Sequence, residues 1–93
     1  MLDPMERLCR VYGKNVSLQP REFELLEAFL RREGRVLSRV YLLETVWGLT
    51  SEVDTRSVDV TVSRLRKKLG PRVAGRFVSV SKLGYRFTGR EEK

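Results

Sequence analysis

The side chains best suited to chemistry lie between positions 56 and 68, where cations alternate with short polar groups. Guanidinium and ammonium groups bind phosphate oxygens, and arginine also makes paired hydrogen bonds to the edge of a guanine. Hydroxyl groups reach bases or phosphates over a short distance, and a small apolar group can contact a thymine methyl. This combination points to nucleic-acid recognition rather than to catalysis. The residues concerned are Arg56, Ser57, Val60, Thr61, Arg64, Arg66, Lys67 and Lys68.

The positions of these residues suggest two roles. We expect Arg64, in the middle of the stretch, to pair with a guanine edge, a contact worth about 1–3 kcal/mol of discrimination. Val60 suits a thymine methyl, and Ser57 and Thr61 suit bases or phosphates. The other cations are expected to contact phosphates, which position a protein without specifying sequence: Arg56, Arg66, Lys67 and Lys68. The alternative is a basic face that is only solvated, with Val60 an ordinary exposed valine.

The composition favours a polyanionic partner and argues against several kinds of site. The chain has a net charge of +7, and residues 55–93 alone carry +8, from eleven basic and three acidic residues. Such asymmetry is the electrostatic footprint of a surface that meets a polyanion. The absence of histidine and the single cysteine exclude histidine-dependent triads and a thiolate zinc site. We therefore expect no enzyme, no metal and no cofactor.

Length and hydropathy predict one domain. The 93 residues, 41% of them apolar, suit one modest core, so a second catalytic lobe does not fit beside it. No apolar run approaches the roughly 18 residues of a membrane span, and residues 1–6 do not resemble a signal peptide. Cys9 has no partner for a disulfide, which is compatible with a reducing compartment. The expected location is the cytoplasm, without membrane contact.

The basic stretch is expected to lie on a helix over about residues 55–69, because its apolar residues recur with helical spacing. Asp54 or Thr55 can cap its start, and Gly70 followed by Pro71 can close its end. At 100° per residue, four apolar side chains fall within a narrow arc opposite the basic face. This buried stripe consists of Val58, Val62, Leu65 and Leu69.

Two shorter helices are predicted before it. The first begins near Pro20 and ends at Gly34, with Phe23, Leu25, Leu26, Phe29 and Leu30 on its apolar side. We interpret its acids, Glu22, Glu24 and Glu27, as solvated. The second follows Ser38 as its N-cap and stops around residues 47–48, before a loop over 49–54. Its apolar side chains are Val40, Leu43 and Val46.

Hairpins are expected at both ends. Residues 8–12 and 16–18 flank a Gly-Lys-Asn turn, with Cys9 packed rather than reactive. Residues 77–81 and 85–88 flank a turn over 82–84. The predicted fold is therefore α+β, with an N-terminal β-sheet, three helices and a C-terminal β-hairpin. It forms a single domain over 1–93, with its core at about 8–88.

Five blocks of sequence resemble the OmpR/PhoB-type winged-helix effector domain, in the same order and over about residues 8–88. They are LQPREFELL (18–26), GRVLSR (34–39), LLETVWG (42–48), VDTRSVDVTVSRLRKKL (53–69) and GYRF (84–87). The resemblance implies a winged helix-turn-helix that follows a phosphorylatable receiver domain and regulates transcription in a bacterial two-component system. Its implied partner is double-stranded DNA with tandem repeats, bound at the nucleoid, with a homodimer forming on the DNA.

The resemblance also implies roles for individual positions. Arg56, Thr61 and Arg66 match positions that often touch phosphate, whereas Ser57, Val60 and Arg64 match base-facing ones. Trp47 matches a position whose indole N–H meets a phosphate, and the last hairpin corresponds to the wing that enters the minor groove. One loop matches the segment that contacts RNA polymerase in family members: Gly48, Leu49, Thr50, Ser51, Glu52 and Val53.

Three positions depart from the family pattern. Gln19 stands where threonine is common, so the first helix loses its usual hydroxyl cap. Thr61 stands where histidine is frequent, which shortens its reach to a phosphate. Ser81 and Lys82 stand where arginine and glycine are usual, so the minor-groove arginine is missing. Lys82 can replace its charge, but lysine lacks the planar fork of arginine.

Two other binding functions remain open from the sequence. A stand-alone winged-helix protein could be a protein-interaction module without specific DNA readout, whose basic helix meets acidic partners. Such a module would keep its affinity for a protein at salt concentrations that abolish DNA binding. An RNA reader would present stacking aromatics. Here Phe23, Phe29 and Phe77 are expected in the core, and only Tyr41 is expected to be exposed.

Overall fold

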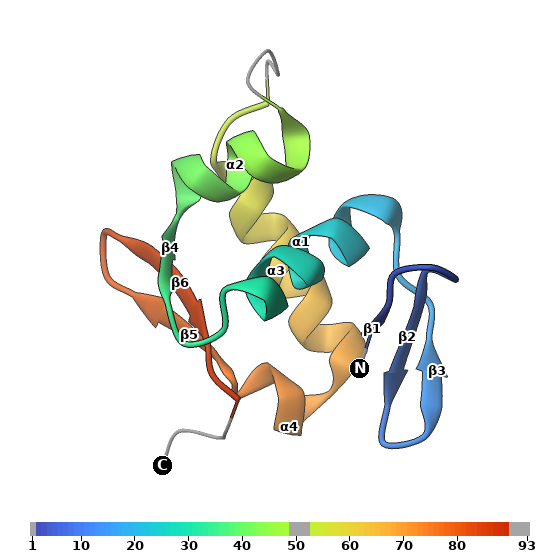
Figure 1. The fold of residues 1–93 in the computed structure, drawn as a ribbon. Coiled ribbons are helices and arrows are strands. Elements are labelled where there is room, and N and C mark those ends of the chain that lie inside the picture. The colour runs from blue at the N-terminus through green and yellow to red at the C-terminus, as the bar shows by residue number, and fades with distance from the viewer. Residues whose placement is uncertain (1, 49–52, 90–93) are drawn as a thin grey trace.

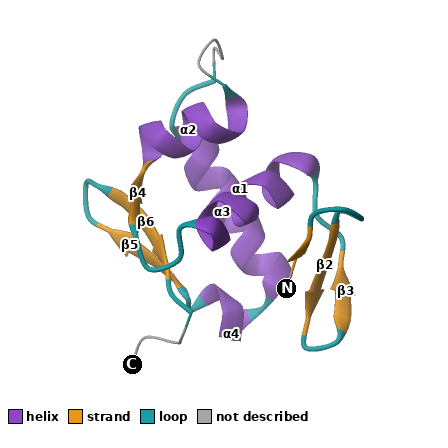
Figure 2. Ribbon diagram, in the orientation of Figure 1, coloured by secondary structure: helices purple, strands orange, loops and turns teal. Residues whose placement is uncertain are grey.

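The computed structural model describes residues 2–48 and 53–89, and these residues form the expected α+β fold (Figures 1 and 2). An N-terminal sheet lies on one side of a group of helices, and a C-terminal sheet lies on the other. Among the described residues, no helix is long and apolar enough to cross a membrane.

The N-terminal sheet is antiparallel, in the order β1 (Leu2–Asp3), β2 (Leu8–Val11) and β3 (Lys14–Val16). The predicted hairpin is confirmed, but β3 begins two residues earlier than expected. The chain reverses over Tyr12 and Gly13, whose φ angles of 50° and 78° are those of a two-residue turn. The two-residue β1 is too short to leave a pattern in the sequence.

Helix α1 (Pro20–Arg31) starts where proline predicts it, because the first N–H of a helix has no intrahelical partner. The carboxylate of Glu22 reaches back and accepts a hydrogen bond from the Gln19 N–H at 2.8 Å. Past the end of α1, Gly34 adopts a φ of 85°, which glycine tolerates best. The buried apolar side of α1 consists of Phe23, Leu25, Leu26, Ala28 and Phe29.

Helix α2 (Arg39–Trp47) has the predicted N-cap, since the Ser38 hydroxyl accepts a hydrogen bond from the Tyr41 N–H at 3.0 Å. The preceding strand β4 (Val36–Ser38) was not expected, because its pairing partner lies almost 50 residues later. Of the apolar side chains expected on this helix, Val46 is buried and Leu43 is partly buried. Leu42 is also buried, and Val40 is exposed.

Helix α3 (Arg56–Leu69) is capped as expected, with the Asp54 carboxylate accepting a hydrogen bond from the Arg56 N–H at 2.9 Å. After Gly70, the chain makes one further helical turn, α4 (Pro71–Ala74), which was not expected from the sequence. The predicted stripe is confirmed, because each of its four residues is at most 4% exposed: Val58, Val62, Leu65 and Leu69.

The C-terminal sheet has the order β4-β6-β5, so that β6 (Gly84–Phe87) lies between β4 and β5 (Phe77–Val80). We call the β5–β6 hairpin the wing. Its turn includes Lys82 at a φ of 64° and is closed by a hydrogen bond from the Leu83 N–H to the Val80 carbonyl at 3.0 Å. Gly84 is required here, because a Cβ atom would lie 2.0 Å from the Leu37 carbonyl oxygen.

One core joins the helices to the wing. Phe29 of α1 meets Phe77 edge-on, with ring centroids 5.3 Å apart, and Phe77 lies 4.7 Å from Phe87. Such pairs add to the burial of apolar area. Helix α1 also contacts both α2 and α3 (Figure 1). The core therefore determines which face of α3 remains outside.

Replacing core residues of α3 tests this arrangement. We expect Val58→Ala and Leu65→Ala each to lower the free energy of unfolding by about 1–4 kcal/mol, because both side chains are fully buried. Val60→Ala is the control, since Val60 is 48% exposed and should change stability by less than about 0.5 kcal/mol. Urea unfolding measures all three. Equal effects at positions 58 and 60 would mean that α3 is rotated differently.

Candidate nucleic-acid interface

A shallow hollow of about 650 Å³ lies where the exposed face of α3 meets the start of α1 and the end of α2. Most of the residues expected at a nucleic-acid interface line it together, although they come from two separate helices. These are Trp47, Arg56, Ser57, Val60, Thr61 and Arg64.

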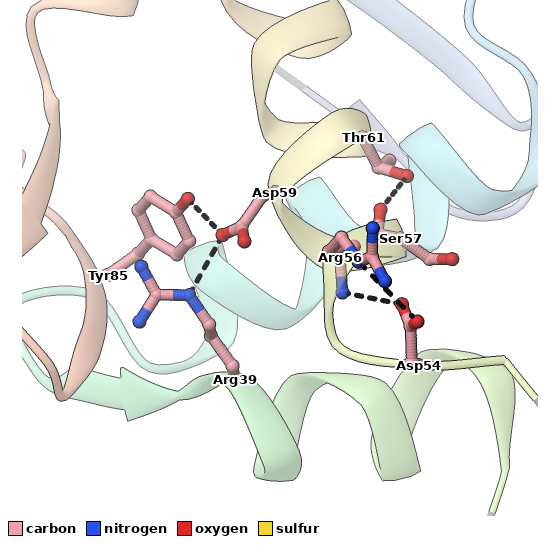
Figure 3. A network of polar contacts seen from close by, with 7 residues as sticks. All are labelled: Arg39, Asp54, Arg56, Ser57, Asp59, Thr61 and Tyr85. Atoms are coloured by element: carbon pink, nitrogen blue, oxygen red, sulfur yellow. Dashed lines mark hydrogen bonds and ion pairs between the residues drawn. The ribbon is translucent and has the colours of Figure 1, made fainter.

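The outermost side chains of this face are mainly cationic. Arg56, Arg64 and Lys67 are exposed, and Val60 lies exposed among them. Arg56 makes a loose ion pair with Asp54 at 3.6 Å, in which both side chains are mostly in solvent (Figure 3). Exposed pairs of this kind contribute little energy. Arg56 therefore remains available to an anionic ligand.

Thr61 does not present its hydroxyl on this face as expected. Its side chain is only 6% exposed, and Oγ1 donates a hydrogen bond to the Ser57 carbonyl at 2.7 Å (Figure 3). On a helix, Thr61 lies about 60° from Val58 and thus at the margin of the buried stripe. The hydroxyl of a threonine at such a position can donate a hydrogen bond to the backbone carbonyl four residues earlier.

Lys68 is also placed differently from the expectation. Its Nζ lies 2.6 Å from Oε1 of Glu22, a carboxylate only 2% exposed. The interpretation of Glu22 as solvated was therefore wrong. The start of α1 packs against α3, and this brings the carboxylate to a lysine 46 residues away. Lys68 compensates a buried charge instead of standing free on the basic face.

Arg66 is directed toward the wing and away from the exposed face. Its Nη2 donates a hydrogen bond to the Phe77 carbonyl at 2.6 Å, and its guanidinium lies 6.0 Å from the centre of the Tyr85 ring. Its Nε is buried without a hydrogen-bond partner among the described residues. The phosphate contact expected of Arg66 does not fit this placement, because the side chain links α3 to β5.

Two residues of the site were missed in the sequence. Arg21 lines the hollow, pairs with Glu24 at 3.1 Å and donates to the Val46 carbonyl at 3.1 Å, so it joins α1 to the end of α2. Asp59 accepts hydrogen bonds on Oδ1 from Arg39 Nε, at 2.9 Å, and from the Tyr85 hydroxyl (Figure 3). In the sequence, Asp59 could have been noticed as an acidic residue within a helix that is otherwise basic.

The remaining candidate residues belong to the wing turn and to the segment that follows α2. The exposed Lys82 is at the turn of the wing, which projects from the body in Figure 1. Gly48 and Val53 border the loop that the family resemblance assigns to RNA polymerase. Its other members lie outside the described residues: Leu49, Thr50, Ser51 and Glu52.

A family model described as "Transcriptional regulatory protein, C terminal" matches residues 13–87. The chain belongs to this family. The resemblance to OmpR/PhoB-type effector domains is thereby confirmed.

Curated relatives extend the match to nearly the whole chain. The sensory transduction protein RegX3 of Mycobacterium tuberculosis is 39% identical over 90 residues, which cover 95% of this chain and 40% of RegX3. The phosphate regulon transcriptional regulatory protein PhoB of Pseudomonas aeruginosa is 38% identical over 88 residues, which cover 95% of this chain and 38% of PhoB. The chain thus spans about two fifths of the length of these relatives.

Solved structures confirm the winged-helix fold. The DNA-binding domain of Bacillus subtilis CssR matches with a TM-score of 0.85 and 30% identity, covering 95% of this chain and 98% of that one. The DNA-binding domain of Klebsiella pneumoniae RstA, solved in complex with the RstA box, matches with a TM-score of 0.81 and 37% identity. That match covers 94% of this chain and 88% of the RstA chain.

In this effector domain, the contacts among Asp59, Arg39 and Tyr85 shift the pKa values of Asp59 and Tyr85. Burial raises the pKa of Asp59, but hydrogen bonds from Tyr85 and Arg39 outweigh it, so that the pKa lies below its usual value. Burial raises the pKa of Tyr85, and the hydrogen bond to Asp59 raises it further. A carboxyl group whose pKa is lowered on folding stabilises the fold at pH values above the pKa that it has in the unfolded chain. A phenol whose pKa is raised on folding stabilises the fold at pH values below its pKa in the unfolded chain. The cluster is therefore intact between about pH 4 and pH 10.

Lys68→Ala tests the structural role of the Glu22 ion pair. We expect the free energy of unfolding to fall by about 1–3 kcal/mol, because a buried acceptor loses its charged partner. Lys67→Ala removes an equal charge from an exposed neighbour and is the control. Thermal and urea unfolding report both variants. If they are equally stable, Lys68 does not support Glu22.

Alkaline titration tests the Asp59 cluster. The difference in tyrosinate absorbance between the unmodified protein and Tyr85→Phe isolates the ionisation of Tyr85. We expect Asp59→Asn to move this step to lower pH, toward the ordinary value of about 10, because the neighbouring negative charge is gone. Spectra recorded immediately after a pH jump precede unfolding. An unchanged step in Asp59→Asn would show that the two side chains do not interact in solution.

Proposed function

We propose that this effector domain binds double-stranded DNA sequence-specifically, with α3 in the major groove and the wing at the adjacent minor groove. The observation that carries the proposal is the exposed face of α3. It gathers cations, a hydroxyl and one apolar side chain at the edge of a hollow, while the opposite face is anchored in the core. The RstA relative, solved with its DNA box, supports this function.

The face has the dimensions and chemistry of a groove reader. The major groove is about 12 Å wide and admits one α-helix. Val60 and Arg64 lie centrally on the exposed face of α3 and would meet base edges, with Ser57 beside them. Arg56 and Lys67 flank them and would meet phosphates, as would Arg21 from α1 and the indole N–H of Trp47.

The wing would contribute a charge contact. Lys82 is exposed at the turn, and a lysine is attracted to the negative potential of a narrow minor groove. Because its ammonium is strongly hydrated and has no planar fork, it would add affinity with little base preference.

The remaining parts of the proposal concern the larger assembly. The relatives are more than twice as long as this chain, and they include a phosphate regulon regulator. We infer that the domain acts in a bacterial two-component phosphorelay, in the cytoplasm at the nucleoid. It would bind tandem repeats as a homodimer and contact RNA polymerase through the loop over 48–53. DNA binding of this kind needs no cofactor and no catalytic step.

A protein-interaction module without DNA readout is the alternative, and the observations favour it less. An acidic protein partner would require only cations on α3. It would not explain why Val60 lies exposed among them, or why residues of α1, α2 and α3 line one hollow.

Selection of bound sequences from random duplex DNA tests the proposal. We expect recovery of a direct repeat, and we expect Arg64→Ala to lose about 1–3 kcal/mol of discrimination at one base pair. Lys67→Ala should instead weaken all duplexes alike and reduce the slope of log affinity against log salt by about 0.9. Single-base operator variants separate these patterns. Recovery of no consensus, or equal losses at every base for Arg64→Ala, would refute sequence reading by α3.

A further inference from the structure

A single carboxylate oxygen joins three elements around the site. Oδ1 of Asp59, on the first turns of α3, accepts hydrogen bonds from Arg39 at the start of α2 and from Tyr85 of β6 (Figure 3). The Arg39 guanidinium also lies 5.1 Å from the centre of the Tyr85 ring. The three side chains therefore form one closed cluster in which each contacts the other two.

The cluster lies where the wing leaves the body of the domain. Tyr85 is paired with Leu37 of β4 and is three residues from Lys82 at the turn. Arg39 follows directly on the last residue of β4. The wing is thus held to the body by the β4–β6 pairing, and to α3 by Asp59 and by the Arg66 hydrogen bond to Phe77.

Energetically, the tyrosine is the important member. The ion pair between Arg39 and Asp59 is partly exposed and contributes little by itself. Tyr85, however, is only 6% exposed, and its hydroxyl donates to Asp59. Without Asp59, this buried hydroxyl would lose its acceptor. A buried polar group without a partner is unfavourable, and this favours one position of β6 against α3.

We infer that Asp59 is a positioning residue that fixes the wing relative to α3, so that Lys82 meets DNA while Val60 and Arg64 read the major groove. The inference rests on the proposed DNA-binding function. Its physical basis is preorganisation: a contact held in place before binding costs less ordering than one on a mobile hairpin. Without Asp59, the contact of Lys82 should contribute little to affinity, whereas contacts made by α3 itself should persist.

A simpler role for Asp59 is local. An acid in the first turns of a helix interacts favourably with the helix dipole and needs no wing to do so. Tyr85→Phe separates the two roles, because it leaves Asp59 at its place on α3 and removes only the hydroxyl that reaches it. The ring of this variant can still pack edge-on against Phe29, 6.5 Å away.

The first experiment measures the free protein. Spin labels on Ser63→Cys of α3 and Ser81→Cys of the wing turn, both at exposed positions, report the distance between the two elements. Cys9 is 1% exposed, so labelling is directed to the introduced thiols. We expect a narrow distance distribution that broadens in Asp59→Ala, which removes the acceptor oxygen, and in Tyr85→Phe, which removes the donor. Glu27→Gln, which breaks the Glu27–Arg31 ion pair on α1, is the matched control and should leave the width unchanged.

The second experiment measures duplex binding across a salt series. We expect Lys82→Ala to reduce the salt slope by about 0.9 in the unmodified background, and by almost nothing when combined with Asp59→Ala or Tyr85→Phe. Arg64→Ala should weaken binding by the same factor in all three backgrounds. A purely structural loss of stability would not produce this selectivity.

The outcomes separate the two proposals. Unchanged label distances, or an equal effect of Lys82→Ala in every background, would overturn the role of Asp59. If Asp59→Ala does not fold, both measurements are made on Tyr85→Phe. A protein that shows the broadening but binds no duplex would refute the DNA-binding function while retaining Asp59 as the residue that positions the wing.

Discussion

Burial of the apolar stripe of α3 is the constraint on which the rest of the site depends. A helix whose Val58, Val62 and Leu65 are in the core can rotate very little, because any turn about its axis exposes apolar area and leaves a cavity. The exposure of Val60 and Arg64 is the geometric consequence. A rigid back and a polar front make the face of α3 a surface of fixed shape, and reading a base edge requires such a shape.

The main elements could be predicted from the sequence because their signals are local. The stripe of α3, the Ser38 cap and the turn residues of both hairpins each lie within a few positions of the structure they determine. Strand β4 and the placement of Lys68 could not be predicted in this way. Each depends on a partner far along the chain, β6 in one case and Glu22 in the other, and helical spacing carries no information about such distances.

The cations of α3 show where prediction from residue type fails. Five were expected to meet DNA, and three of them are exposed on the basic face without a contact to a buried group among the described residues, namely Arg56, Arg64 and Lys67. Lys68 compensates a buried carboxylate and Arg66 binds a carbonyl of β5. Long cationic side chains can serve the fold as well as the ligand. The net charge of a segment therefore overstates the charge that it can offer to a phosphate.

Asp59 is the converse case, an acid on a helix that is otherwise basic. An unpaired carboxylate there would repel DNA phosphates, since charges interact over roughly 10 Å at moderate salt. The Arg39 guanidinium, with Nε 2.9 Å from Oδ1 of Asp59, offsets that charge, and the Tyr85 hydroxyl donates a hydrogen bond to the same oxygen. The cluster thereby keeps a negative group on α3 without weakening the field of its exposed face. Exchanging Asp59 for an apolar residue would remove the repulsion too, but it would leave the Tyr85 hydroxyl without its acceptor and Arg39 without its counter-ion.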